Sequence, residues 1–174
     1  ILWSAGGARA NTFSEDWFKR IKDSGCIGVN FGFETGSSKM LQIMEKKVAL
    51  EDNYKAMKNG VDVGFNMGMQ FVLGMPGETE ETVAETIEFI KYGITLAPSQ
   101  NLDRYAVNYS MALPGTPLYE YGRHKGLIGK TIDEEEEYLL SISNRDAVEE
   151  VTAVNFTETP RLRWMAWRPY IQIC

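Results

Sequence analysis

The sequence predicts an α/β protein, a partial (βα) barrel of parallel strands with outer helices and a TIM-barrel-like layout. Strand-like apolar segments alternate along the chain with amphipathic helical segments, which is typical of parallel sheets with crossover helices. Within the strand-like segments, bulky apolar residues alternate with small or polar ones. Polar residues also recur at the spacing of one βα unit, at Glu34, Gln70 and Asn108.

Four segments are expected to be strands. They are Ile1 to Ala5, Cys26 to Glu34, Val63 to Leu73 and Arg104 to Met111. A doubly wound parallel sheet buries both faces and reads as continuous apolar runs. A barrel instead places bulky residues outward against helices and leaves its inner face for ligand. Because four strands cannot close a barrel, the chain is expected to be part of a longer protein.

Three helical regions separate these strands. Their expected limits are Ser14 as N-cap with Gly25 past the end, Ser37 to about Gly60 with a break near Lys47, and Thr79 as N-cap with Gly93 as the stop. Ser and Thr are preferred N-caps, and glycine commonly follows a helix end. Helices of this length suit the crossovers between parallel strands.

Composition excludes several classes of protein. The formal net charge of −6 argues against non-specific nucleic-acid binding. No run of about 18 apolar residues indicates a membrane span, and no signal peptide is visible. The two cysteines and single histidine offer neither a disulfide framework nor a metal site. A cytoplasmic protein without a nucleic-acid partner is expected.

The strand that ends at Glu34 raises a specific question. Burying a carboxylate costs on the order of several kcal/mol of desolvation free energy unless another group pairs with it. The residues on the same face of this strand are small, so Glu34 is expected to face a ligand. Gln70 and Asn108 share the polar face, although inward amides also bond to each other. Arg9 and Lys46 are the nearest cations, and exposed cations often serve only solubility.

A rigid loop follows each of three strands. The loops contain "ETGS", "GMPGET" and "LPGTPLYE". Gly36 is expected to permit a tight turn, and Ser37 or Ser38 to cap the next helix. Backbone N–H groups there suit either an anion or an ordinary helix cap, and this choice stays open.

Taken together, these motifs are specific. The order and spacing of "GFETGS", "MEKKV", "GMPGET" and "PGTPLY" resemble the later part of a radical S-adenosylmethionine domain. The similarity is greatest to the subgroup whose members often carry a cobalamin-binding domain. It covers about residues 1–128, which are expected to be the later βα units. Residues 129–174 are expected to form a mainly helical C-terminal extension.

The resemblance implies a set of cofactors. Members of this family hold a 4Fe–4S cluster through a CxxxCxxC loop, and the cluster cleaves S-adenosylmethionine to start radical chemistry. That loop is absent from this chain, whose cysteines are Cys26 and Cys174. By comparison with the family, the chain begins at about the third strand. An upstream part of the same protein is therefore the expected partner, and the use of cobalamin stays open.

The resemblance also implies roles for individual residues. Glu34, Lys46, Gln70 and Asn108 match cofactor-contacting positions, and Arg9 and Ser110 are candidates for substrate contact. Glu34 is expected to contact S-adenosylmethionine, Lys46 its carboxylate and Gln70 its ribose hydroxyls. No residue is expected to bind metal. The expected function is orientation of the cofactor and of a small-molecule substrate for radical chemistry at a C–H bond.

Two alternatives remain. A different βα-barrel enzyme would bind a phosphorylated metabolite through the loop at Gly36 to Ser38. A non-catalytic remnant would instead use its exposed sheet edge to pair with another chain. The first predicts phosphate affinity, and the second predicts self-association without a ligand.

Overall fold

The computed structural model describes residues 1–98, 105–143 and 153–173 of the 174-residue chain. At its centre is a four-stranded parallel sheet in the order β1-β2-β3-β4. The strands are β1 (Trp3–Ala8), β2 (Cys26–Glu34), β3 (Asn66–Leu73) and β4 (Tyr105–Tyr109). This sheet confirms the expected α/β class and the parallel arrangement of the strands.

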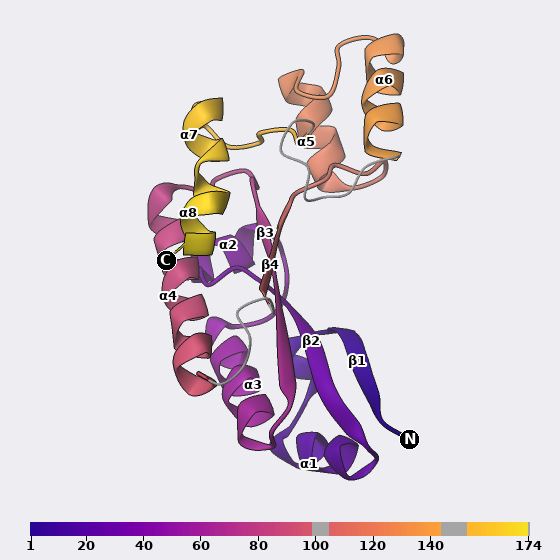
Figure 1. The fold of residues 1–174 in the computed structure, drawn as a ribbon. Helices are drawn as coiled ribbons and strands as arrows, with labels where there is room; N and C mark the ends of the chain where they lie inside the picture. The colour runs from indigo at the N-terminus through magenta and orange to yellow at the C-terminus, as the bar shows by residue number, and fades with distance from the viewer. Residues whose placement is uncertain (99–104, 144–152, 174) are drawn as a thin grey trace.

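Helices cover one face of the sheet and extend beyond its carboxyl edge (Figure 1). They are η1 (Ala10–Thr12), α1 (Glu15–Asp23), α2 (Ser38–Ile43), α3 (Leu50–Asp62), α4 (Glu80–Leu96), α5 (Pro117–Lys125), α6 (Ile132–Ser143), α7 (Arg161–Met165) and α8 (Trp167–Ile173). Helices α5 and α6 lie beyond the end of β4, whereas α8 returns beside α4 (Figure 1). Among the described residues no helix is long and apolar enough to cross a membrane.

Several strand limits differ from those expected. β1 begins at Trp3 and continues to Ala8. β3 begins only at Asn66, because Val63 still caps α3 and Gly64 turns the chain with a φ of 74°. β4 ends at Tyr109, and the expected start at Arg104 lies outside the described residues.

Bulky side chains form the core between the sheet and its helices. The largest fully buried side chains include Phe31, Phe33, Phe71 and Phe89. The expected alternation holds along β3, but it is wrong at the start of β2. There Cys26 is buried and Ile27 is 40% exposed, because a register shift between β1 and β2 adds one residue to β2.

The helix limits confirm the caps and correct one stop. Ser14 caps α1, and its Oγ accepts a hydrogen bond from the Trp17 N–H at 3.3 Å. Thr79 occupies the N-cap position of α4. Gly93 does not end α4, which continues to Leu96. A Cβ at Gly93 would lie 3.1 Å from both Met57 and Met69, so close packing explains this glycine.

Buried residues form two clusters. The larger one lies around the sheet and includes Trp164 and Trp167 from the C-terminal helices. The smaller one joins the segment after β4 to α5 and α6 through Ala112, Tyr119 and Tyr138. The expected domain limit between residues 128 and 129 stays a prediction.

Candidate functional site

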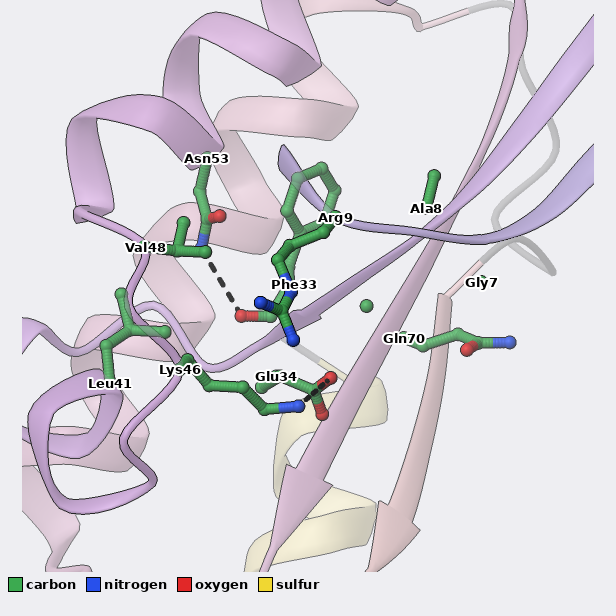
Figure 2. A pocket seen from close by; sticks show the side chains of 11 residues that line it. Gly7, Ala8, Arg9, Phe33, Glu34, Leu41, Lys46, Val48, Asn53 and Gln70 are labelled. Atoms are coloured by element: carbon green, nitrogen blue, oxygen red, sulfur yellow. Dashed lines mark hydrogen bonds and ion pairs between the residues drawn. The ribbon is translucent and has the colours of Figure 1, made fainter. Parts of the chain in front are cut away.

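A cavity of about 200 Å³ opens where β1 and β2 end. Its polar side chains are Arg9, Glu34, Lys46, Asn53 and Gln70, and Figure 2 shows how they surround it. They come from the residue after β1, the end of β2, the connector between α2 and α3, α3 itself, and β3. The carboxyl ends of parallel strands share one edge of the sheet, so residues far apart in sequence meet here.

Glu34 has an unusual backbone conformation. Its φ is 66°, in the left-handed region that non-glycine residues seldom adopt. A bulge accompanies this conformation, since Gly32 pairs with Gln70 and Glu34 already pairs with Phe71. A Cβ on Gly32 would lie 2.7 Å from Glu34 Oε1. The bulge and the missing side chain at Gly32 therefore let the Glu34 carboxylate fold back along the inner face of β2.

Lys46 meets this carboxylate. Its Nζ donates to Glu34 Oε1 at 2.7 Å. The Glu34 side chain is 17% exposed and that of Lys46 is 35% exposed. Glu45 and Lys47, on either side of Lys46, both have left-handed backbones with φ of 52° and 53°. These two turns form the connector from which Lys46 reaches the cavity.

Arg9 adds a second cation. It is exposed, follows β1 and lines the same cavity, and Figure 2 shows its guanidinium directed toward the Glu34–Lys46 pair. Within the described residues Arg9 makes no side-chain hydrogen bond or ion pair. The cavity therefore holds two cations and one carboxylate. This set suits a zwitterionic ligand, whose carboxylate binds a cation and whose ammonium group binds Glu34.

Asn53 supports the site from behind and was not predicted. Its side chain is buried, and Nδ2 donates to the Phe33 carbonyl at 3.3 Å. This bond fixes the peptide that immediately precedes Glu34. The sequence signal is slight: Asn53 is the polar member of the buried stripe of α3, which also contains Ala56, Met57 and Gly60.

Two backbone N–H groups of the loop after β2 donate hydrogen bonds to side chains of the protein itself. The Gly36 N–H donates to Thr86 Oγ1 at 3.0 Å, and the Ser37 N–H donates to Thr35 Oγ1 at 3.1 Å. The two threonine hydroxyls also bond to each other at 3.0 Å. The donors that a phosphate would need at Gly36 and Ser37 are therefore already used. Ser37 is the N-cap of α2, but its side chain makes no capping bond.

Gly36 is needed for a different reason from the expected one. Its φ is not positive, so the tight turn does not require glycine. A Cβ there would lie 2.5 Å from the Glu85 carbonyl oxygen and 2.7 Å from Thr86 Cα. The glycine lets the loop pack directly against the backbone of α4.

The structure brings Gln70 to the cavity but leaves Asn108 and Ser110 outside its lining. Gln70 is exposed on the inner face of β3, and its carboxamide is directed away from Glu34 (Figure 2). Asn108 is half-buried opposite Val72. Ser110 is buried beyond the end of β4, where its N–H donates to the Leu73 carbonyl at 2.8 Å. The ligand roles of all three residues stay predictions.

A second carboxylate, Glu78, follows β3 and was also not predicted. It is only 4% exposed, and its Oε2 accepts the Gly74 N–H at 2.5 Å. Burial raises the pKa of Glu78 from 4.5 to about 7, although hydrogen bonds from the backbone of Gly74 and Met75 oppose the shift. The sequence showed only an acidic residue in the "GMPGET" turn. Its burial depends on the segments packed over that turn.

The described residues do not fit an iron–sulfur cluster. Cys26 is their only cysteine, and it is buried in the core with Sγ 3.3 Å from the Gly28 carbonyl oxygen. Cys174 lies outside the described residues. No group of three possible metal-ligating side chains occurs in the described part of the chain.

The sheet and the cavity at its carboxyl edge define the class: a partial parallel βα barrel that carries its candidate site where the strands end. The family model of the Radical SAM superfamily matches residues 2–90, just over half of the chain. The chain therefore belongs to the Radical SAM superfamily. The family expected from the motifs is confirmed.

Known proteins agree with this assignment. The chain is 32% identical over 128 residues to an uncharacterized methyltransferase of Pyrococcus horikoshii, an alignment covering 74% of this chain and 26% of that protein. It thus spans about a quarter of the length of this relative. Two solved structures show the same fold at low sequence identity.

The first is the radical S-adenosylmethionine methyltransferase TsrM from Kitasatospora setae, solved with cobalamin and a [4Fe–4S] cluster bound. Its TM-score is 0.54 at 22% identity, over 72% of this chain and 24% of that chain. The second is the archaeal Elp3 of Methanocaldococcus infernus, with a TM-score of 0.59 at 17% identity, over 99% of this chain and 42% of that chain. These likenesses concern the fold alone.

Proposed function

We propose that the cavity at the ends of β1 and β2 binds the amino-acid end of S-adenosylmethionine in a radical methyltransferase. Glu34 accepts hydrogen bonds from the ligand ammonium group, and Lys46 and Arg9 bind its carboxylate. Gln70, at the cavity edge, binds the ribose hydroxyls. The observation that carries the proposal is the Glu34–Lys46 ion pair at 2.7 Å beside Arg9, which no described residue pairs.

Family membership supports this ligand, and the methyltransferase relative supports the reaction type. When bound, S-adenosylmethionine would supply a 5′-deoxyadenosyl radical on one-electron reduction, or its methyl group to a nucleophile without reduction. The described residues hold no ligands for a 4Fe–4S cluster, so they act only by binding, orienting and shielding. An upstream part of the same protein is the proposed source of the cluster. Cobalamin use and a cytoplasmic location belong to the same proposal.

The pre-formed ion pair has a physical advantage in this role. In the absence of ligand, Lys46 compensates the Glu34 charge at the partly buried strand end. A zwitterionic ligand exchanges this internal pair for two charge-assisted contacts, one with each partner. The unpaired Arg9 then gives the ligand carboxylate a second donor group. The alternative of a phosphate bound by the loop at Gly36 to Ser38 is disfavoured. The Gly36 and Ser37 N–H groups already donate to the hydroxyls of Thr86 and Thr35.

Calorimetric titration with S-adenosylhomocysteine tests the site. Glu34→Gln is expected to weaken binding about tenfold, since a hydrogen bond to a charged group contributes roughly 1.5 kcal/mol or more. Glu45→Gln is the matched control, because Glu45 is exposed in the same connector and does not line the cavity. Equal affinity of Glu34→Gln and the unchanged protein would remove Glu34 from the site.

A further inference from the structure

A second cavity, of about 460 Å³, lies on the inner face of the sheet and shares Gln70 with the first. Its described lining residues lie in all four strands, and none of them is Asp, Glu, Lys, Arg or His. The two cavities thus meet at Gln70; the first contains the charged Glu34, and the second has no charged side chain among its described lining residues. Figure 2 shows the Gln70 carboxamide directed away from Glu34.

On this inner face an asparagine of one strand lies across a glycine of the neighbouring strand at two places. A Cβ on Gly68 of β3 would lie 1.8 Å from Asn30 Oδ1 of β2. A Cβ on Gly28 of β2 would in turn lie 3.0 Å from Asn66 Cβ of β3. Each glycine therefore makes room for an asparagine on the other strand. This reciprocal arrangement explains why small and polar residues alternate on this face.

Two carboxamides of the cavity lining, those of Asn30 and Gln70, remain available to a ligand. Asn30 and Gln70 are exposed, and neither makes a side-chain hydrogen bond with the described residues. Each carboxamide offers an adjacent donor and acceptor. The 40% exposed Ile27 and the exposed Ala106 add apolar surface to the same cavity. An apolar wall with a few convergent hydrogen-bonding groups is typical of small-molecule sites.

The chemistry of these groups restricts the ligand. Among the described lining residues a phosphate or carboxylate would find no cation to pair with it, and burying an unpaired charge is costly. A trans peptide directs its N–H and C=O to opposite sides, so it cannot bond to both groups of one carboxamide along a single edge. A ring lactam presents N–H and C=O side by side. Asn and Gln make a comparable two-bond contact with the N6 and N7 edge of adenine, which likewise offers an adjacent donor and acceptor.

We propose that the uncharged cavity receives a neutral lactam-type ring of the substrate, such as a nucleobase edge, with Asn30 and Gln70 as its hydrogen-bonding partners. This inference rests on the proposed function, because it places the substrate beside the S-adenosylmethionine site. Gln70 lies at the boundary, where the two ligands approach each other, and its carboxamide has two N–H donors and two acceptor lone pairs to divide between the ribose hydroxyls and the ring.

The test is a nuclear magnetic resonance titration of the ¹⁵N-labelled chain, following the side-chain amide signals of Asn30 and Gln70. Uracil is the lactam probe, orotate is its negatively charged counterpart, and N-methylacetamide represents a trans peptide. Uracil is expected to shift both signals, whereas the other two probes leave them unchanged. Asn30→Asp is expected to weaken uracil binding about tenfold, because the carboxylate donates no hydrogen bond and adds a charge.

Gln42→Glu is the control variant, since it adds the same charge at an exposed position of α2 outside the cavity. It is expected to bind uracil as the unchanged chain does. Unshifted Asn30 and Gln70 signals, or binding of orotate as strong as that of uracil, would overturn the inference. A parallel titration with S-adenosylhomocysteine separates the two proposals. Binding of uracil without binding of S-adenosylhomocysteine would reject the cofactor site alone.

Discussion

Two glutamates lie at or just beyond the ends of neighbouring strands of one sheet, and they are stabilised in opposite ways. Glu34 is partly exposed and pairs with Lys46 at 2.7 Å. Glu78 is 4% exposed, and only backbone N–H groups and desolvation determine its pKa, which is raised to about 7. The first carboxylate lies at the edge of a cavity, where a ligand can reach it. The second is buried in the loop after β3, and burial favours its neutral, protonated form. Burial and partners, rather than residue type, therefore separate a binding group from a structural one.

The largest expected effect concerns the loop after β3. Glu78→Ala removes the acceptor of the Gly74 N–H and leaves buried backbone donors without a partner, so it is expected to lower the free energy of unfolding by about 3 kcal/mol. Urea denaturation at pH 6 measures the loss. Glu85→Ala, at an exposed position of α4, is the control and is expected to change stability by less than about 0.5 kcal/mol. Similar values for both variants would show that the loop does not depend on Glu78.

The second effect is a pH dependence with a defined sign. The pKa of Glu78 rises from 4.5 in its ordinary state to about 7 on folding, so the folded protein holds this proton more tightly. The resulting stabilisation is complete below pH 4.5 and declines as the pH rises through 7. Glu78→Gln cannot release a proton there. Between pH 5 and pH 8 the unchanged protein is expected to lose about 2 kcal/mol relative to this variant.

Denaturation curves of both proteins across this pH range provide the measurement. Parallel profiles would mean that Glu78 is already ionised in the fold at pH 5, which would contradict the raised pKa. A steeper decline for the unchanged protein would confirm that the loop after β3 loosens as Glu78 ionises.

A smaller effect is expected behind the charged site. Asn53→Ala removes the hydrogen bond to the Phe33 carbonyl, which still accepts the Thr35 N–H at 2.8 Å. Because one bond remains, the expected loss is about 1 kcal/mol of stability. Asn59→Ala on the same helix is the control, since Asn59 is only partly buried. Thermal unfolding of the two variants shows whether the hydrogen bond of Asn53 stabilises the end of β2 or whether any such substitution weakens α3. Equal losses of stability in both variants would argue against a specific role of Asn53.

The period of two along the strands was enough to predict the polar inner face and the place of Glu34 and Gln70. It failed at Cys26 and Ile27, because a bulge inverts the facing of residues without changing the sequence pattern. Local signals also located the helix caps at Ser14 and Thr79. Interactions between distant elements were not predictable in the same way.

Asn53 and Thr86 acquire their roles only when α3 and α4 pack beside the end of β2. Glu78 likewise becomes a buried carboxyl only because neighbouring segments cover its loop. At Gly93 the preference of glycine for helix ends predicted that α4 stops there. The structure shows instead that glycine is needed for close packing against Met57. Packing between elements thus outweighs local propensity at the positions where side chains are buried between them.

The smallest effect is expected at the ion pair itself. Lys46→Met leaves Glu34 without its cation, but both side chains retain contact with water, so the loss is expected to stay below about 1 kcal/mol. Lys47→Met is the control, because Lys47 is exposed next to it and forms no ion pair in the described structure. Urea denaturation of both variants gives the difference directly. A loss above about 2 kcal/mol would indicate a desolvated, structural pair. A small loss would mean that the pair contributes little to folding, as a site that opens to a charged ligand requires.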